Sequence, residues 1–149
     1  FNLQIKIIRI FNTYGPNMSI NDGRVVSNFI VSSLKNEPLK IYGNGNQTRS
    51  FCYVDDLIDG MIKMMGSKNN FCGPCNLGNP HEIKIKDLAK KIISLTKSKS
   101  KIINLNSQKD DPKIRKPNIE LAKNNLNWKP KVSIESGLIK TIEYFDSIL

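Results

Sequence analysis

Arg9 and Asn12 lie where an apolar segment of the sequence gives way to a turn. The apolar run Ile5–Ile10 predicts a buried strand. Gly15-Pro16 ends it, because proline cannot donate to a ladder and glycine permits a turn. Both polar residues therefore fall near the carboxyl end of a strand, the edge at which open α/β sheets bind ligands. A guanidinium and an amide there suit an anionic, hydroxyl-rich ligand, although Arg9 alone is explained as well by a surface ion pair.

Two loops further along the chain also carry fixed positive charge. The first, residues 42–49, is a glycine-rich turn that ends in Arg49, and the second, residues 110–117, contains Arg115. Arginine stays charged and pairs in a two-pronged way with phosphate or carboxylate oxygens. A single arginine is most simply a surface charge, but the spacing and the flanking motifs of these two favour contact with an anionic ligand.

The elements that must position these residues are both strands and helices, which predicts a mixed α/β fold. We expect strands at residues 4–10, 39–42, 75–77 and 101–105, and an extended segment at 47–54. Helices are expected at 24–35, 85–96 and 118–126, with another that begins at a cap formed by Asp55 or Asp56 and a final one capped by Ser133. The strand at 4–10 should belong to a parallel sheet whose other strands lie outside this sequence.

The composition limits the classes of protein that the chain can represent. Its 149 residues suffice for one domain with a modest core, and 39% of them are hydrophobic. A net charge of +10 favours acidic ligands, although much of it lies in solvated lysine-rich segments. A nucleic-acid-binding module rests on this charge alone, since no zinc-finger spacing, RNA-binding aromatic motif or basic helix accompanies it. No apolar run is long enough to span a bilayer and no signal peptide is visible, which predicts a cytoplasmic protein.

The three cysteines predict reduced thiols. Their number is odd and no secretory signal accompanies them. Cys72-Gly-Pro-Cys75 spells a thioredoxin-type motif, but that chemistry needs its first cysteine at a helix N-terminus, where the helix dipole lowers the pKa of the thiol. Here a turn at residues 76–80 follows instead. A zinc site made of Cys72, Cys75 and His81 would still need a fourth ligand, so no metal is expected.

Five segments of the sequence read RIFNTYGP, DGRVVSNF, PLKIYGNGNQTRSFCYVDDL, NLGNP and DDPKIRKP, in this order. In these segments and their order the chain resembles the C-terminal half of the extended short-chain dehydrogenases/reductases, the NAD-dependent epimerase/dehydratase family. Within that superfamily it most resembles the UDP-glucuronate decarboxylases, which DGRVVSNF separates from the sister dehydratases and epimerases. The resemblance implies that residues 1–16 are the last part of a Rossmann-type sheet with its exit loop, that 17–149 form the substrate-binding lobe, and that the dinucleotide-binding half is absent.

The resemblance also implies an NAD-dependent reaction on a nucleotide sugar. Such enzymes oxidise carbon 4 of UDP-glucuronate with bound NAD, lose carbon dioxide from the resulting β-keto acid, and reduce the ketone to give UDP-xylose. They use a glycine-rich dinucleotide loop and a Tyr-x-x-x-Lys pair, and this sequence contains neither, so the chain alone is expected to be inactive. A nucleotide-sugar 4,6-dehydratase or 4-epimerase is the alternative. The homodimer common in the family is expected of the full-length enzyme.

The residues that the sequence retains are those that hold the nucleotide sugar. By resemblance, Asn12 hydrogen-bonds the substrate, and Arg9 is assigned to the substrate side with it. The nucleotide and sugar side is lined by Arg24, Val25, Ser27, Asn28 and Phe29. The chain departs from the family at Asn17, since an arginine commonly follows Gly-Pro.

The two cationic loops take the remaining roles that the resemblance implies. Tyr42 and its neighbours, Gln47 among them, hold the uracil, mostly by backbone groups. Arg49 and Arg115 face the diphosphate and the sugar. Arg115 is also the candidate that steers the carboxylate, or the enolate formed after decarboxylation, by its charge.

Overall fold

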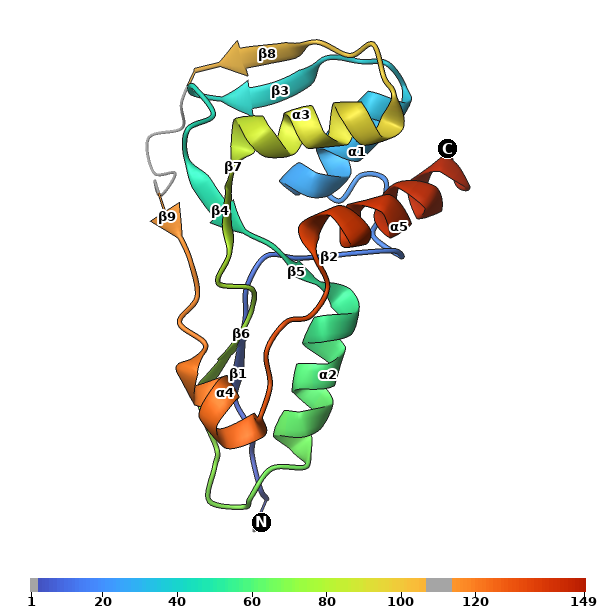
Figure 1. Cartoon of the computed structure of the whole chain (residues 1–149). Coiled ribbons are helices and arrows are strands. Elements are labelled where there is room, and N and C mark those ends of the chain that lie inside the picture. The colour runs from blue at the N-terminus through green and yellow to red at the C-terminus, as the bar shows by residue number, and fades with distance from the viewer. Residues whose placement is uncertain (1–2, 107–113) are drawn as a thin grey trace.

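The computed structural model of the protein describes residues 3–106 and 114–149. Its elements form two parts (Figure 1). The first part contains the parallel strands β1 (Ile8–Ile10) and β6 (Cys75–Leu77) and the helices α2 (Val54–Met65) and α4 (Glu120–Leu126). The second contains the helices α1 (Val25–Leu34), α3 (Ile85–Thr96) and α5 (Ile134–Asp146) and the parallel strands β3 (Leu39–Tyr42) and β8 (Ile102–Leu105).

Two short sheets connect these parts. β2 (Thr13–Tyr14) pairs in parallel with β5 (Cys52–Tyr53). β4 (Thr48–Ser50) lies between the antiparallel β7 (Glu82–Lys84) and the parallel β9 (Ile114–Arg115). The chain therefore passes between the two parts several times, and residues of β2, β4 and β5 come to lie at their junction (Figure 1).

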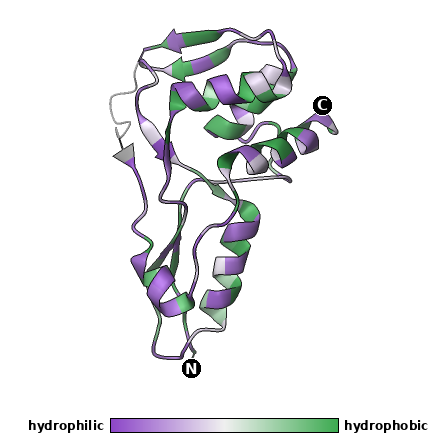
Figure 2. Ribbon diagram, in the orientation of Figure 1, coloured by the Kyte–Doolittle hydropathy of each residue, from purple (hydrophilic) through white to green (hydrophobic). Residues whose placement is uncertain are grey.

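Each part has a hydrophobic core of its own. The larger core lies where α1, α3 and α5 pack together, and its fully buried side chains include Ile30, Leu88, Ile92, Leu138 and Phe145. The smaller core surrounds Trp128 and includes Met64, Leu77 and Ala122. Figure 2 shows hydrophobic and hydrophilic residues alternating along α3, as expected of a helix with one buried face.

Several helices agree with the sequence predictions. The helix expected at 85–96 is confirmed as α3, with the same bounds. The cap at Ser133 is also confirmed, because its Oγ accepts a hydrogen bond from the Ser136 N–H at 3.1 Å. Within the described ranges, no helix is both long and apolar enough to cross a membrane.

The strand expected at 4–10 is shorter and more exposed than the sequence predicts. β1 spans only three residues, because its partner β6 is preceded by a proline and followed by a glycine. The pairing is parallel, as expected, but this partner lies within the chain. The prediction of a buried strand is wrong, since Ile5, Ile7 and Ile10 expose half or more of their surface. The described helices that contact the β1–β6 sheet leave these side chains uncovered.

The prediction that Asp55 or Asp56 caps α2 is wrong. The N-cap residue is Tyr53, and no side chain accepts a capping hydrogen bond there. Asp56 lies in the first turn of α2, and its carboxylate instead accepts from the N–H groups of Lys131 and Val132, at 3.0 and 2.9 Å. These hydrogen bonds hold the segment that precedes α5 against the first turn of α2.

The three cysteines are free thiols in the structure. Cys72 is exposed in the loop before β6, so a strand follows the Cys-Gly-Pro-Cys motif, as the sequence predicts. Cys52 and Cys75 are buried. Burial, with a smaller contribution from Asp56, raises the pKa of the Cys52 thiol to about 12, and burial also raises that of Cys75.

A thiol reagent such as Ellman's is therefore expected to label Cys72 rapidly in the native protein and the other two cysteines only on unfolding. Cys72→Ser should abolish the fast reaction and change the free energy of unfolding by less than about 0.5 kcal/mol, because the residue lies on the surface. Cys75→Ser should lower that free energy by about 1–3 kcal/mol, because a hydroxyl replaces a thiol in the core. Two rapidly labelled thiols, or equal losses of stability in the two variants, would contradict this assignment.

Candidate functional site

A cleft with a volume of about 1010 Å³ opens beside α1 and β3. Eight of the eleven residues that the sequence predicts for substrate binding line it: Asn12, Arg24, Val25, Asn28, Phe29, Tyr42, Gln47 and Arg49. They belong to three separate motifs of the sequence. The fold therefore brings together residues that the sequence assigned to one ligand, although their role in binding stays a prediction.

Asn12 is held in a strained conformation just after β1. Its φ of 29° lies in the left-handed region, which costs free energy in a residue other than glycine. Its Nδ2 donates to the Ser50 carbonyl oxygen at 3.1 Å, and its own carbonyl oxygen accepts from the Cys52 N–H at 3.1 Å. Strain of this kind persists where the surrounding structure holds it, and it clusters at functional sites. Within the described part of the chain, the side-chain oxygen of Asn12 is left as an acceptor for a ligand.

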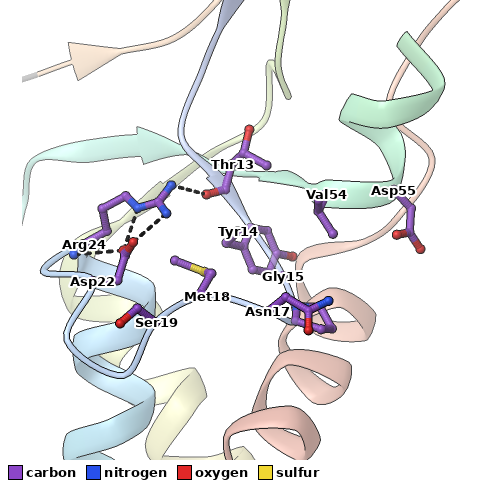
Figure 3. Close-up of a pocket in the computed structure, with 11 residues that line it drawn as sticks. Thr13, Tyr14, Gly15, Asn17, Met18, Ser19, Asp22, Arg24, Val54 and Asp55 are labelled. Carbon is purple, nitrogen blue, oxygen red and sulfur yellow. Dashed lines mark hydrogen bonds and ion pairs between the residues drawn. The ribbon is translucent and has the colours of Figure 1, made fainter. Parts of the chain in front are cut away.

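Arg24 lies between the large cleft and a second pocket of about 520 Å³, and it lines both. Figure 3 shows its guanidinium against Asp22, with Nε 2.6 Å from Oδ2 and Nη2 2.7 Å from Oδ1. Gly23, between the two residues, has a φ of 83°, a conformation that favours glycine and turns the chain so that the pair can form. The hydrogen bonds from Arg24 lower the pKa of the Asp22 carboxyl, so both partners are charged at neutral pH.

The glycine-rich turn after β3 brings Gln47 next to Tyr42. Gly43 and Gly45 have φ values of 71° and 72°, which again favour glycine. Gln47 Nε2 donates to the Tyr42 carbonyl oxygen at 2.8 Å. The Tyr42 side chain is about half exposed at the end of β3, so its ring offers a flat surface that lines the cleft.

Arg49 and Arg115 occupy directly paired positions in the parallel strands β4 and β9. Paired residues project from the same face of a sheet, so the side chains of the two arginines begin next to each other on this face. Arg49 is 8% exposed, and its Nη1 donates to the Thr48 carbonyl oxygen at 2.7 Å. Arg115 is exposed and is not among the described residues that line the cleft, and residues 107–113 of its loop lie outside the described part of the chain. Neighbouring cations repel each other, which favours an anion near them.

Two further predicted residues are not among the described residues that line the cleft. Arg9 lies in β1 and is exposed, in the other part of the fold. Ser27 is fully buried in α1, where its Oγ donates to the Arg24 carbonyl oxygen at 2.9 Å and to Asp22 Oδ2 at 3.3 Å. The structure therefore places Ser27 behind the Asp22–Arg24 pair, and substrate contact by Arg9 or Ser27 stays a prediction.

Other residues of these pockets were not predicted from the sequence. Lys35, Glu37 and Lys40 line the large cleft, and no local pattern distinguishes these lysines from the many others of the chain. Asp22 lines the smaller pocket, and the signal for it was the DGR sequence itself, with an acid and a base on either side of a glycine. Asn17, where the chain departs from the family, also lines the smaller pocket, with a φ of 66°.

Comparisons of the sequence with known proteins agree on a family. The sequence model of the NAD dependent epimerase/dehydratase family matches residues 1–78. UDP-glucuronic acid decarboxylase 1 of Danio rerio is 50% identical over 143 residues, which cover 96% of this chain and 34% of that protein. UDP-glucuronic acid decarboxylase 4 of Arabidopsis thaliana is 46% identical over 144 residues, which cover 97% of this chain and 32% of that protein. The chain thus spans about a third of the length of these curated relatives.

Solved structures of similar proteins share the fold. UDP-glucuronic acid 4-epimerase from Bacillus cereus, in complex with UDP-glucuronic acid and NAD, superposes with a TM-score of 0.91 at 29% identity, over 100% of this chain and 47% of that chain. Pal from Bacillus thuringiensis gives a TM-score of 0.89 at 37% identity, over 100% of this chain and 48% of that chain. These matches confirm the predicted mixed α/β fold of a Rossmann-type epimerase. With more than half of its residues matched by the family's sequence model, the chain belongs to the NAD dependent epimerase/dehydratase family.

Proposed function

We propose that the chain is the substrate-binding part of an NAD-dependent enzyme that converts UDP-glucuronate to UDP-xylose with loss of carbon dioxide. The observation that carries this proposal is the 44–50% identity to relatives named UDP-glucuronic acid decarboxylase, over 91% or more of the chain. The Bacillus cereus 4-epimerase is 29% identical. Its close superposition makes 4-epimerisation the second candidate, and the difference in identity favours decarboxylation.

The lining of the large cleft suits a nucleotide sugar with several negative charges. Cations outnumber acids among the lining residues by four to one: Arg24, Lys35, Lys40 and Arg49 against Glu37. Such an excess attracts a diphosphate and a carboxylate. The exposed ring of Tyr42 offers a surface for a base, and the side-chain oxygen of Asn12 offers an acceptor for a hydroxyl group.

The proposal places NAD on the rest of the full-length protein. This chain contains no glycine-rich loop of the type that cradles a dinucleotide pyrophosphate, and the smaller pocket is lined by side chains such as Thr13, Asn17 and Asp55 instead. The described residues therefore do not fit the whole cofactor by themselves. Their proposed role is to bind and orient the nucleotide sugar.

The organisation of the full-length protein is also a proposal. The resemblance assigns residues 1–16 to the last part of a Rossmann-type sheet with its exit loop and residues 17–149 to a substrate lobe, although β1 pairs with β6, which comes after that boundary. The homodimer and the cytoplasmic location expected above stay predictions, and size-exclusion chromatography of the full-length protein tests the first of them.

Product analysis tests the proposed function. Full-length protein incubated with UDP-glucuronate and NAD is expected to form UDP-xylose and carbon dioxide in equal amounts. The 149-residue chain alone is expected to release no carbon dioxide, because it lacks the dinucleotide loop and the Tyr-x-x-x-Lys pair. UDP-galacturonate formed without carbon dioxide would show that the protein is a 4-epimerase instead. Carbon dioxide released by the chain alone would show that the chemistry does not need the other half.

A further inference from the structure

The carboxylate of Asp22 is occupied by Arg24 and by the turn around it. Oδ2 accepts from Arg24 Nε at 2.6 Å, and from Ser27 Oγ and the Arg24 backbone N–H at 3.3 Å each. Oδ1 accepts from Arg24 Nη2 at 2.7 Å. The Asp22 side chain is 15% exposed, whereas that of Arg24 is 57% exposed. Asp22 therefore holds one edge of the guanidinium and leaves the rest of it accessible.

A second contact fixes the plane of the guanidinium. The Thr13 carbonyl oxygen accepts from Arg24 Nη1 at 3.2 Å, as Figure 3 shows. Three of the five N–H groups of Arg24 are thus used, and the other two have no partner in the part of the chain that the structure describes. Because Arg24 lines both pockets, these two donors are available to a ligand there.

This arrangement differs from an ordinary ion pair on a surface. Exposed pairs contribute little, because solvent screens them and the side chains keep their freedom. Here the carboxylate binds the guanidinium in a two-pronged way, buried Ser27 supports the carboxylate, and the Thr13 carbonyl holds the opposite side. An arginine held in this way is oriented before a ligand arrives.

We propose that Asp22 is a positioning residue, which holds the Arg24 guanidinium in one orientation at the boundary of the two pockets so that it can donate to the anionic sugar of the substrate. This inference rests on the proposed function. Because Asp22 also offsets the charge of Arg24, removal of the carboxylate charge does not weaken the attraction for anions, whereas the orientation of the guanidinium is lost. Turnover and ligand affinity should therefore respond differently.

Asp22→Asn keeps the shape of the side chain and removes one of its two acceptor oxygens. In the full-length protein we expect it to lower the turnover of UDP-glucuronate by about tenfold to a hundredfold, while the dissociation constant for UDP rises by less than about twofold. Asp22→Glu keeps both acceptors and should recover part of the loss. Asp59→Asn is the matched control, because Asp59 also pairs with a cation, Lys63 at 3.1 Å, but lies on α2 and lines neither pocket.

A double-mutant cycle with Arg24→Ala separates action through Arg24 from a general structural role. If Asp22 acts through Arg24, then adding Asp22→Asn to Arg24→Ala changes turnover by less than about twofold. Unchanged turnover in Asp22→Asn would overturn the inference. So would a double variant whose loss of turnover equals the product of the losses in the two single variants.

Isotope labelling of the arginine side chains gives a readout that needs no turnover. In the full-length protein, the Nε–H signal of Arg24 can be assigned by its loss in Arg24→Ala. We expect the Nε proton of Arg24 to exchange slowly with water and its signal to shift when UDP-glucuronate is added. In Asp22→Asn the proton should exchange rapidly and the shift should be lost. A full-length protein that releases no carbon dioxide would refute the proposed decarboxylation, and these signals would still decide the role of Asp22. An Arg24 signal that Asp22→Asn leaves unchanged would refute the positioning role.

Discussion

Asp56→Ala is expected to lower the free energy of unfolding by about 2–6 kcal/mol, because two backbone N–H groups lose their acceptor and each costs about 1–3 kcal/mol when left unpaired. Asp56 is 6% exposed, and its two carboxylate oxygens accept from Lys131 and Val132 separately. Alanine has no side-chain acceptor and can replace neither bond. The segment between α4 and α5 should therefore loosen from α2.

The same helix offers a matched control for Asp56→Ala. Asp59 is about half exposed and pairs on the surface with Lys63, so Asp59→Ala should change the free energy of unfolding by less than about 1 kcal/mol. Asp56→Asn should be intermediate, since one acceptor oxygen remains. Urea denaturation can be followed by the fluorescence of Trp128, whose Nε1–H donates to the Asp56 carbonyl oxygen at 2.9 Å. Equal losses in Asp56→Ala and Asp59→Ala would contradict the structural role assigned to Asp56.

Asp56 also illustrates which parts of the fold can be predicted from the sequence. Helix α3 was predictable, because its periodic residues Ile85, Leu88 and Ile92 carry the pattern of a buried face within one segment. The partners of Asp56 lie 75 and 76 residues further along the chain. Local rules therefore assign Asp56 to a cap, and only the packing of α5 and its preceding segment shows its actual bonds.

The candidate site, too, can be predicted where its residues are neighbours in the sequence and not where their positions depend on the folded chain. Tyr42, Gln47 and Arg49 were predictable as a group, because the glycine-rich turn that joins them is local in the sequence. The sequence places Arg9 and Asn12 near the end of one strand. In an extended chain, however, residues three apart point to opposite faces, and the left-handed conformation of Asn12 turns the chain after β1 ends at Ile10. Asn12 therefore reaches the cleft and Arg9 does not line it.

Arg49→Ala is expected to weaken the binding of UDP and of UDP-glucuronate alike, by about tenfold to a hundredfold, because loss of a charge-assisted contact costs about 1.5–3 kcal/mol. Arg49 lines the cleft next to the glycine-rich turn and is almost fully buried, so its guanidinium has little freedom before a ligand binds. Arg49→Lys should recover only part of the affinity, because lysine keeps the charge and lacks the planar fork. Thermal unfolding of both variants shows whether the loss of the contact with the Thr48 carbonyl oxygen also weakens the fold.

Arg115→Ala is expected to lower turnover more than it lowers affinity for UDP. Arg115 is exposed in β9 and does not line the described cleft, so UDP should bind largely without it. The resemblance predicts that Arg115 faces the reacting sugar, and in the proposed reaction its charge would matter most as negative charge develops on the enolate. Calorimetry with UDP, set beside steady-state kinetics with UDP-glucuronate, separates the two effects.

A lysine must serve as the control for both variants, because all four arginines of the chain are predicted site residues. Lys123→Ala is suitable, since Lys123 lies on α4 and pairs with Glu120 at 2.7 Å. If Arg49→Ala and Arg115→Ala both bind UDP and turn over normally, then the site is wrongly assigned. If Arg115→Ala weakens UDP binding as much as Arg49→Ala does, then the two arginines hold one anion together. Their paired positions in β4 and β9 would explain that outcome, and the double variant should then lose little more affinity than either single one.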